Sequence, residues 1–143
     1  LHGVFGASAL TDDKPMPTTD YSIESMKDTV VPNRNMVMLA IAVSKAIQMG
    51  FDAVAYGAHA GDTEVYPDCR DEFVQTMTKA ISICDWSKIT LLAPLISMTK
   101  RQVVNYARTL SVPIEKTWSC YSGGDKPCGV CGACRSREEA LCE

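Results

Sequence analysis

The sequence lacks a long apolar run, because no stretch approaches the roughly 20 apolar residues that a membrane-spanning helix needs. Its first residues also lack the basic and then apolar layout of a secretory signal peptide. Positive charge is not in excess: 14 Lys and Arg residues face 17 Asp and Glu residues, for a net charge of −3. Domains that bind a nucleic-acid backbone are usually strongly basic. These absences predict a cytoplasmic protein with neither a membrane nor a nucleic acid as a direct partner.

The length of 143 residues suits about one domain. Because 46% of the residues are hydrophobic and 22% are charged, the chain can bury a core and has the composition of a globular protein. It contains neither an internal repeat nor a low-complexity tract. The first residue is Leu1 rather than methionine, which favours a fragment, a processed product or a trimmed chain. We therefore expect residues 1–143 to form a single, partial domain.

A first helix is predicted over Arg34–Met49. Pro32 and Asn33 are its start signal, and Gly50 stands in the preferred position after the last turn. Apolar residues recur there at three- and four-residue spacing, which predicts a largely buried helix. The stripe expected to face the core consists of Val37, Ala40, Ile41, Ser44 and Ile47.

Two further helices are predicted later in the chain. One begins near Arg70, and the other begins at Thr99, whose spacing to Gln102 matches a capping box, and ends before Pro113. The positions expected to face the core are Phe73, Met77, Ala80 and Cys84 in the first of these helices and Val103, Tyr106, Ala107 and Leu110 in the second.

Two short apolar segments, at residues 52–57 and 89–92, have the character of buried parallel strands. The order helix, strand, helix, strand, helix predicts an α/β fold in which crossover helices join parallel strands. Because a doubly wound sheet uses about five strands, the remaining strands are expected upstream of Leu1. Residues 1–30 are rich in turn-forming residues and are expected to be a surface connection.

Four of the seven cysteines lie in one short segment with the spacing C-x7-C-x2-C-x2-C, namely Cys120, Cys128, Cys131 and Cys134. In a reducing compartment this pattern favours a metal site over disulfides. Four thiolates fill a closed tetrahedral zinc site and leave no position for water, so a structural zinc is expected in residues 117–137. Glycines at 123, 124, 129 and 132 permit the tight turns that the site needs. Free thiols and an iron–sulfur cluster are the alternatives.

A polar loop at residues 58–67 follows the first predicted strand, where α/β sheets bind ligands. Just after it, Asp68 can accept the adjacent N–H donors of a guanine-like base, while Arg70 can hold a carboxylate or a phosphate. The alternative is a helix N-terminus with acidic capping residues, Asp68, Asp71 and Glu72, which the helix dipole stabilises. His59 by itself is typical of a hydrogen-bonded loop histidine, and nothing in the sequence activates Cys69 as a nucleophile.

The chain resembles the QueC family of 7-cyano-7-deazaguanine synthases. The resemblance rests on six motifs in the family's order, which lead into the cysteine cluster: SALT (8–11), VPNRN (31–35), YGAHAGD (56–62), YPDCRDEF (66–73), APL (93–95) and TWSCY (117–121). It implies an adenine nucleotide α-hydrolase-like, Rossmann-like parallel sheet with a C-terminal four-cysteine zinc segment. The implied activity is an ATP-dependent ligase that converts 7-carboxy-7-deazaguanine and ammonia to the nitrile.

The resemblance also implies site residues, although it assigns no catalytic residue. The substrate pocket would be lined by His59, Tyr66, Asp68 and Arg70, and zinc would be held by the four clustered cysteines. Arg34 and Asn35 would face the nucleotide or would only cap their helix. A homodimer is implied, with ATP, ammonia and the deazaguanine acid as small-molecule partners.

Two departures from the family pattern affect these expectations. The family's Ser-Gly-Gly-x-Asp-Ser phosphate loop has no counterpart, because Ser122-Gly-Gly124 lies within the cysteine segment and lacks the following Asp-Ser. Without that cradle of backbone N–H groups, the chain alone is expected to be inactive. Asn33 replaces the family's usual Gly, and Asn tolerates the positive φ that such a turn needs.

Two other functions are compatible with the same residues. One is another ATP pyrophosphatase of the phosphate-loop class, such as a tRNA-modifying enzyme. Residues 115–143 carry four basic and five acidic side chains, so affinity for tRNA is not favoured. The other is a non-catalytic zinc-ribbon interaction module, for which residues 58–70 would be dispensable.

Overall fold

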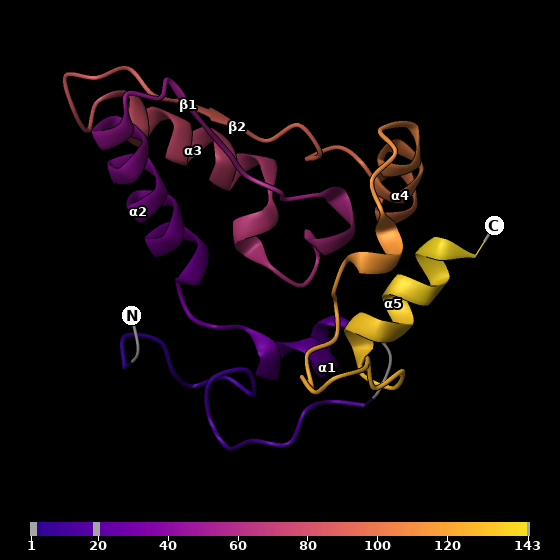
Figure 1. Cartoon of the computed structure of the whole chain (residues 1–143). Helices are drawn as coiled ribbons and strands as arrows, with labels where there is room; N and C mark the ends of the chain where they lie inside the picture. The colour runs from indigo at the N-terminus through magenta and orange to yellow at the C-terminus, as the bar shows by residue number, and fades with distance from the viewer. Residues whose placement is uncertain (1–2, 19–20, 143) are drawn as a thin grey trace. The chain divides into compact units, whose positions relative to one another are not determined.

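The computed structural model describes residues 3–18 and 21–142 of the chain. These residues form two compact units (Figure 1). One unit takes the described residues of Leu1–Pro32 and Thr99–Glu143, and the other comprises Asn33–Met98. No helix in the described ranges is long and apolar enough to cross a membrane. The predicted single domain over 1–143 and zinc segment over 117–137 stay predictions.

The unit Asn33–Met98 is built on two parallel strands, β1 (Ala53–Ala55) and β2 (Thr90–Leu92), with Val54 opposite Leu91. The helix α3 (Asp71–Ser82) lies between them in sequence, so the unit has a β-α-β crossover. This order confirms the predicted α/β class and the parallel pairing. Both strands are shorter than predicted, although the backbone hydrogen bond from Tyr56 to the Leu92 carbonyl (2.7 Å) continues the pairing beyond β1.

The strands are not buried throughout, which corrects the prediction. Leu91 is buried and Val54 is half-buried, whereas Ala55, Thr90 and Leu92 are exposed. Side chains alternate between the two faces of a sheet. Leu91 and Val54 pack in the cluster formed with the neighbouring helices, and residues of the other face remain open within the described part of the chain.

The predicted bounds of the first long helix are confirmed, because α2 spans Arg34–Met49. Asn33 precedes it in the left-handed region with φ of 57°, as expected for a residue that tolerates positive φ. Gly50 ends the helix with φ of 74°. Its N–H is bonded to helix carbonyls, so the left-handed stop predicted from the sequence is present.

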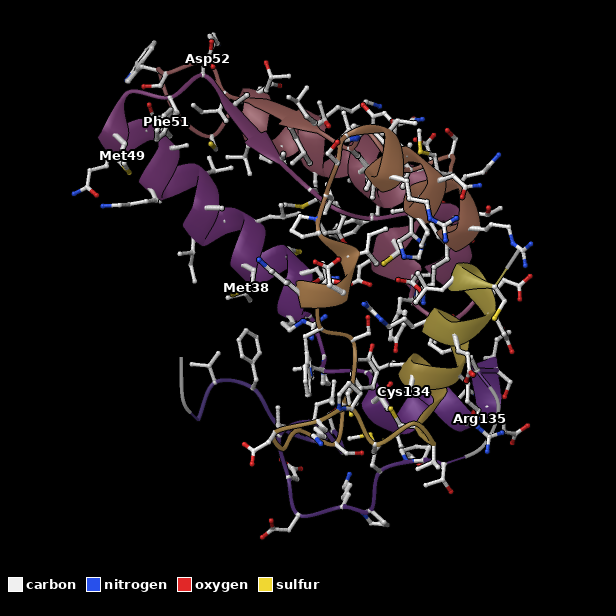
Figure 2. All side chains as sticks on the ribbon, turned by 45° about the vertical axis from the view of Figure 1, so that its right-hand side comes forward. Met38, Met49, Phe51, Asp52, Cys134 and Arg135 are labelled. Atoms are coloured by element: carbon white, nitrogen blue, oxygen red, sulfur yellow. The ribbon has the colours of Figure 1, made fainter. Side chains whose placement is uncertain are left out.

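The predicted inward stripe of α2 is wrong. The buried residues are Leu39, Val43 and Ala46, and only Ile47 of the predicted stripe packs beside them; Ala40, Ile41 and Ser44 are exposed, and Val37 is half-buried. Because apolar residues occur on every face of α2, periodicity alone could not select the buried one. Met38 and Met49 lie on α2 and Phe51 just beyond it, and all three are exposed (Figure 2).

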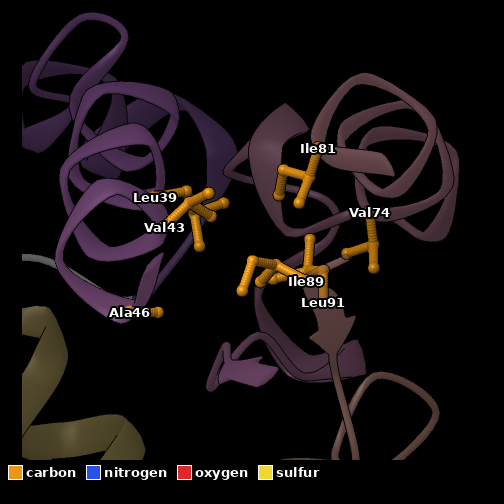
Figure 3. Packing of buried hydrophobic residues seen from close by; sticks show 7 residues of the cluster. All are labelled: Leu39, Val43, Ala46, Val74, Ile81, Ile89 and Leu91. Atoms are coloured by element: carbon orange, nitrogen blue, oxygen red, sulfur yellow. The ribbon is translucent and has the colours of Figure 1, made fainter. Parts of the chain in front are cut away.

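The core of this unit joins α2, α3 and the second strand. Its side chains point toward one another from these elements (Figure 3), and the buried members are Leu39, Val43, Ala46, Val74, Ile81, Ile89 and Leu91. Burying a Leu, Ile or Val side chain contributes about 1.5–3 kcal/mol each before the entropy cost of folding. This cluster therefore holds both helices on one side of the strand pair.

The helix α3 begins as predicted, since Arg70 is its N-cap. Its buried residues are Val74 and Ile81, with Phe73 and Met77 half-buried beside them. The prediction that Cys84 belongs to the core is wrong, as is the same prediction for Ala80. The helix ends at Ser82, and Cys84 lies beyond it in an exposed turn. The predicted stripe therefore continues two residues past the end of the helix.

The other unit contains α4 (Lys100–Thr109) and α5 (Gly132–Leu141). The capping box at Thr99 is confirmed: Thr99 accepts from the Gln102 N–H, and the Gln102 side chain accepts from the Thr99 N–H. Val103 and Ala107 are half-buried, but Tyr106 and Leu110 are exposed, which corrects their predicted burial. Leu110 is the C-cap rather than a helical residue.

The helices α4 and α5 are joined by polar contacts. Lys100 Nζ donates to Ser136 Oγ (2.9 Å). Arg101 and Arg108 donate to the carbonyls of Glu139 and Leu141, each at 3.2 Å. Cations near a helix C-terminus are favoured by its exposed carbonyls and dipole. The two arginines therefore stabilise the end of α5.

The N-terminal segment has more structure than predicted. It contains α1 (Ile23–Met26) and the 3₁₀ turn η1 (Lys27–Thr29). Ser22 and Ser25 form a capping box that starts α1. Ser8 is fully buried and donates to the Asp28 carbonyl (3.2 Å). The turn-rich composition indicated a surface connection because these short elements have no periodicity to detect. Residues 1–2 and 19–20 of the predicted connection lie outside the described residues.

Candidate metal centre and ligand loop

The four clustered cysteines converge in space. The Sγ atoms of Cys120, Cys128, Cys131 and Cys134 all lie within 4.8 Å of one another. In a tetrahedral zinc site with Zn–S bonds of about 2.3 Å, neighbouring sulfurs stand about 3.8 Å apart. The donor chemistry and the spacing therefore fit a four-thiolate metal ion. Cys142 is exposed and lies outside the cluster, which already has the four thiols that a tetrahedral site needs.

The turns between the cysteines depend on glycine. Gly123, Gly124 and Gly129 have φ of 69°, 89° and 74°, a region that other residues adopt only with strain. Gly132 has a different role from the predicted turn, because it is the first residue of α5. A Cβ atom placed there would stand 2.8 Å from the Met26 sulfur, so Gly132 allows close packing against α1.

Hydrogen bonds to sulfur favour thiolates within the cluster. The Cys128 N–H donates to Cys120 Sγ (3.3 Å), and the Cys131 N–H donates to Cys128 Sγ (3.4 Å). The Ser122 hydroxyl, assisted by backbone N–H groups, lowers the pKa of Cys128 to about 6. Burial raises the pKa of Cys134 to about 12. A metal ion would displace the remaining thiol protons, so its binding would release protons.

The helix α5 supplies the last ligand and anchors the segment. Cys131 is its N-cap and Cys134 lies in its first turn (Figure 2). Arg137, one turn further, donates to Thr117 Oγ1 and to the Ile114 carbonyl, each at 2.7 Å. These bonds hold the irregular segment of backbone that leads to Cys120. Sequence reasoning missed Arg137, because its partners are about 20 residues away and lie in irregular backbone.

The loop after β1 contains two short turns, η2 (Ala60–Asp62) and η3 (Pro67–Cys69). His59 Nε2 lies 3.3 Å from Asp62 Oδ2, and both side chains are largely buried. This matches the sequence interpretation of His59 as a hydrogen-bonded loop histidine. The Ala60 N–H donates to the Met98 carbonyl (2.9 Å), which joins the loop to the segment after β2.

Asp68 and Arg70 lie on either side of Cys69, where η3 leads into α3. The Asp68 side chain is half-buried, and no hydrogen bond or ion pair holds its carboxylate within the described residues. Arg70 is exposed, and its Nε donates to the Thr63 carbonyl (3.0 Å). Asp68 does not cap α3, since the N-cap is Arg70. The capping alternative therefore fits Asp71 and Glu72 in the first turn, but not Asp68.

Tyr56 links the predicted site residues of this unit. Its hydroxyl accepts from Asn35 Nδ2 (3.0 Å) and donates to the Asp68 carbonyl (2.9 Å). The Cys69 sulfur lies 3.9 Å from the same oxygen. Arg34, at the first position of α2, donates from Nε to Asn35 Oδ1 (3.4 Å). In the sequence Tyr56 is recognisable only as part of a motif, because residue spacing does not reveal which hydroxyl contacts which loop.

The environment of Cys69 argues against a nucleophile. Its side chain is buried, and burial raises the pKa of its thiol to about 11. At neutral pH the group is therefore protonated, whereas nucleophilic attack requires a thiolate. The hydroxyl of Tyr56 also has its pKa raised by burial and stays protonated.

The residues predicted for the substrate and the nucleotide all belong to the unit Asn33–Met98, and the cysteine cluster belongs to the other unit. An apolar hollow of about 420 Å³ lies between α2 and α3 in the first of these units. Its walls include Val43, Ile47, Met77 and Ile81 but none of the predicted ligand residues. The roles predicted for His59, Tyr66, Asp68, Arg70, Arg34 and Asn35 stay predictions.

Comparison with known proteins identifies the family. The family model described as "Queuosine biosynthesis protein QueC" matches residues 1–143. The chain belongs to this family. Its motifs and cysteine spacing are therefore those of a queuosine biosynthesis protein, and the resemblance drawn from them is confirmed.

Curated relatives agree with this assignment. Proteins named 7-cyano-7-deazaguanine synthase are 41% identical over 141 residues in Pseudoalteromonas atlantica, 43% over 142 residues in Archaeoglobus fulgidus and 48% over 135 residues in Caldicellulosiruptor saccharolyticus. These alignments cover 99%, 99% and 94% of this chain. They cover 65%, 59% and 60% of the relatives, so the chain spans about three fifths of their length.

Proposed function

We propose that this chain is part of an ATP-dependent 7-cyano-7-deazaguanine synthase, a carbon–nitrogen ligase of queuosine biosynthesis. The match of the QueC family model to the whole chain carries the proposal. Relatives with that enzyme's name, 41–48% identical, support it. The small-molecule partners would be 7-carboxy-7-deazaguanine, ATP and ammonia, and the protein would act as a cytoplasmic homodimer.

The proposed chemistry proceeds in two activations. The carboxylate of the acid attacks ATP and releases pyrophosphate, and ammonia then displaces AMP from the acyl adenylate to form an amide. A second ATP then reacts at the amide oxygen with release of pyrophosphate and a proton, and loss of AMP with the remaining nitrogen proton leaves the nitrile. Positioning and neutralisation of phosphate charge would carry most of the rate. No group of the chain needs to form a covalent intermediate, which agrees with the protonated Cys69 thiol.

The substrate would bind at the loop after β1. A deazaguanine ring presents N1–H and an exocyclic amine as adjacent donors, and the half-buried Asp68 carboxylate can accept both. Arg70 can hold the ligand's carboxylate with the terminal nitrogens of its exposed guanidinium, because its bond to the Thr63 carbonyl uses Nε. His59 and Tyr66 would line the same pocket. Arg34, at the exposed N-terminus of α2, would face the nucleotide.

A zinc ion on the four clustered cysteines would be structural. Four thiolates complete a tetrahedral shell and leave no open position at which water or substrate could be activated. The cysteine segment has little apolar surface to bury. Between Ser122 and Cys131, six residues are exposed and belong to no helix or strand: Gly123, Gly124, Asp125, Lys126, Pro127 and Gly129. The ion would therefore supply the energy that shapes it.

The decisive assay uses the complete gene product with 7-carboxy-7-deazaguanine, ATP and ammonium, and mass spectrometry detects the nitrile. Asp68→Asn should lower kcat/KM by at least about tenfold, because it replaces one acceptor oxygen by a donor that opposes the ligand's N–H. The matched control Asp13→Asn, at an exposed position of the other unit, should leave kcat/KM unchanged.

Absence of both nitrile formation and ATP consumption would remove the proposed function. Full activity of Asp68→Asn would instead overturn the role proposed for Asp68 in binding the substrate. A mobility shift of tRNA at physiological salt would favour a tRNA-modifying enzyme.

A further inference from the structure

The hydroxyl of Tyr56 stands where three separate segments of one unit meet. It follows β1, it accepts from Asn35 in the first turn of α2, and it donates to the Asp68 carbonyl in η3. A phenol has one donor hydrogen and two acceptor lone pairs. With Asn35 and Asp68 bonded and the Cys69 sulfur 3.9 Å away, its hydrogen-bonding capacity is used within the protein.

The position of this hydroxyl is determined by its own backbone and ring. The Tyr56 N–H is bonded to the Leu92 carbonyl at 2.7 Å, which fixes the residue to the sheet. Its ring packs against Phe73, with centroids 6.5 Å apart and planes tilted by 58°. Tyr56 and Phe73 are both partly buried and pack against the core of this unit. The hydroxyl is therefore a rigid point to which less regular segments are attached.

The attached segments carry the predicted ligand residues. The bond to the Asp68 carbonyl fixes the backbone of the residue whose carboxylate would accept the deazaguanine donors. On the other side, Asn35 uses Nδ2 for Tyr56 and Oδ1 for Arg34 Nε, so both ends of its amide contact protein. A continuous chain of hydrogen bonds thus runs from Arg34 through Asn35 and Tyr56 to Asp68.

We propose that Tyr56 is a positioning residue, whose hydroxyl, held by Asn35, keeps Asp68 in place to bind the deazaguanine acid. The inference rests on the proposed function for its ligand. In this arrangement Asn35 acts through Tyr56 and not through the nucleotide. The same chain of hydrogen bonds sets the distance between Arg34, which would face the nucleotide, and Asp68, which would bind the deazaguanine base.

The test compares Tyr56→Phe with Tyr106→Phe in the complete gene product. Both changes remove one phenolic oxygen, but Tyr106 is exposed on α4 in the other unit. Calorimetry measures the Kd of 7-carboxy-7-deazaguanine, and hydrogen exchange measures the opening of residues 66–70. Tyr56→Phe should raise the Kd about three- to tenfold and speed the exchange of residues 66–70 by a similar factor. Tyr106→Phe should change neither.

The outcomes separate this inference from the proposed function. If the unaltered protein does not bind the acid, the proposed substrate is wrong. The hydrogen exchange of residues 66–70 then decides the positioning role by itself: faster exchange in Tyr56→Phe supports the role, and unchanged exchange overturns it. If the acid binds and Tyr56→Phe has a normal Kd, the positioning role is overturned. A lower melting temperature with an unchanged Kd also overturns it, because that combination identifies a purely structural hydroxyl.

A second variant covers the case in which Tyr56→Phe does not fold. Asn35→Ala removes the bond that holds the hydroxyl and leaves the aromatic packing intact, so it should weaken acid binding by a smaller factor. Where both single variants fold, the double variant should be no worse than Tyr56→Phe alone, because the two residues act through one hydroxyl. Additive losses of affinity would overturn the chain of action from Asn35 to Tyr56.

Discussion

Single residues in this protein differ in how far their roles follow from sequence. Asn33 stands where the QueC family usually has Gly and is a residue type that tolerates positive φ, and it has φ of 57°. The clustering of four cysteines that could hold a metal ion followed from their spacing in the sequence. Tyr56 and Arg137 did not, because each acts on a segment that is distant in sequence and is met only in the folded chain. Local geometry is encoded locally, whereas a long-range hydrogen bond is not.

Cysteine reactivity gives a prediction at this scale. In folded protein at pH 7, iodoacetamide should modify the exposed Cys84 and Cys142 and leave Cys69 unmodified. The pKa of Cys69 is raised to about 11, so its thiolate fraction is very small until the pH rises well above neutral. Peptide mapping by mass spectrometry measures each site. Modification of Cys69 at a rate equal to that of Cys84 would contradict the buried, protonated thiol.

Whole elements were predicted better at their ends than on their faces. The ends of α2 and the start of α4 were confirmed because capping residues act within one turn. The buried face of α2 was wrong, since a helix that is apolar on every side offers several equivalent stripes. Cys84 was placed in the core because its stripe was continued past the end of α3.

The capping box of α4 can be tested by substitution. Thr99→Ala removes the hydroxyl that accepts from the Gln102 N–H at 3.2 Å, so the free energy of unfolding should fall by about 1 kcal/mol. Denaturant titration measures this change. The control Ser97→Ala, at an exposed position two residues earlier, should alter stability by less than about 0.5 kcal/mol. An equal effect of the two substitutions would contradict a specific cap.

At the scale of the molecule, the described chain consists of two units with different means of stabilisation. The unit Asn33–Met98 has an apolar core between α2, α3 and β2. The other described unit has a smaller cluster in which three of the four buried members are cysteines of the candidate metal centre, Cys120, Cys131 and Cys134. Stability of that second unit is therefore expected to depend on metal.

Removal of metal tests this expectation. A strong chelator at neutral pH should speed hydrogen exchange in residues 117–137 and lower the melting temperature, because four adjacent thiols without an ion cannot replace the metal–sulfur bonds. Exchange in α2 and α3 should change much less. Lower pH should make the metal easier to remove, because protons then compete with the metal for each ligand thiolate.

Cys128→Ser should reproduce the effect of the chelator, whereas Cys84→Ser, outside the cluster, should not. Elemental analysis gives the metal content of each protein. A well-folded protein without bound metal would contradict the proposed zinc site.

The sequence by itself determined the features that depend on neighbours along the chain: helix ends, the α/β alternation, the cysteine spacing and the motifs that identify the QueC family. The tertiary structure decided which helix face is buried and how Tyr56 joins Asn35 to Asp68. The physical reason is range. Caps and turns act over three or four residues, while packing and the Tyr56 bonds join residues that only the folded chain brings into contact.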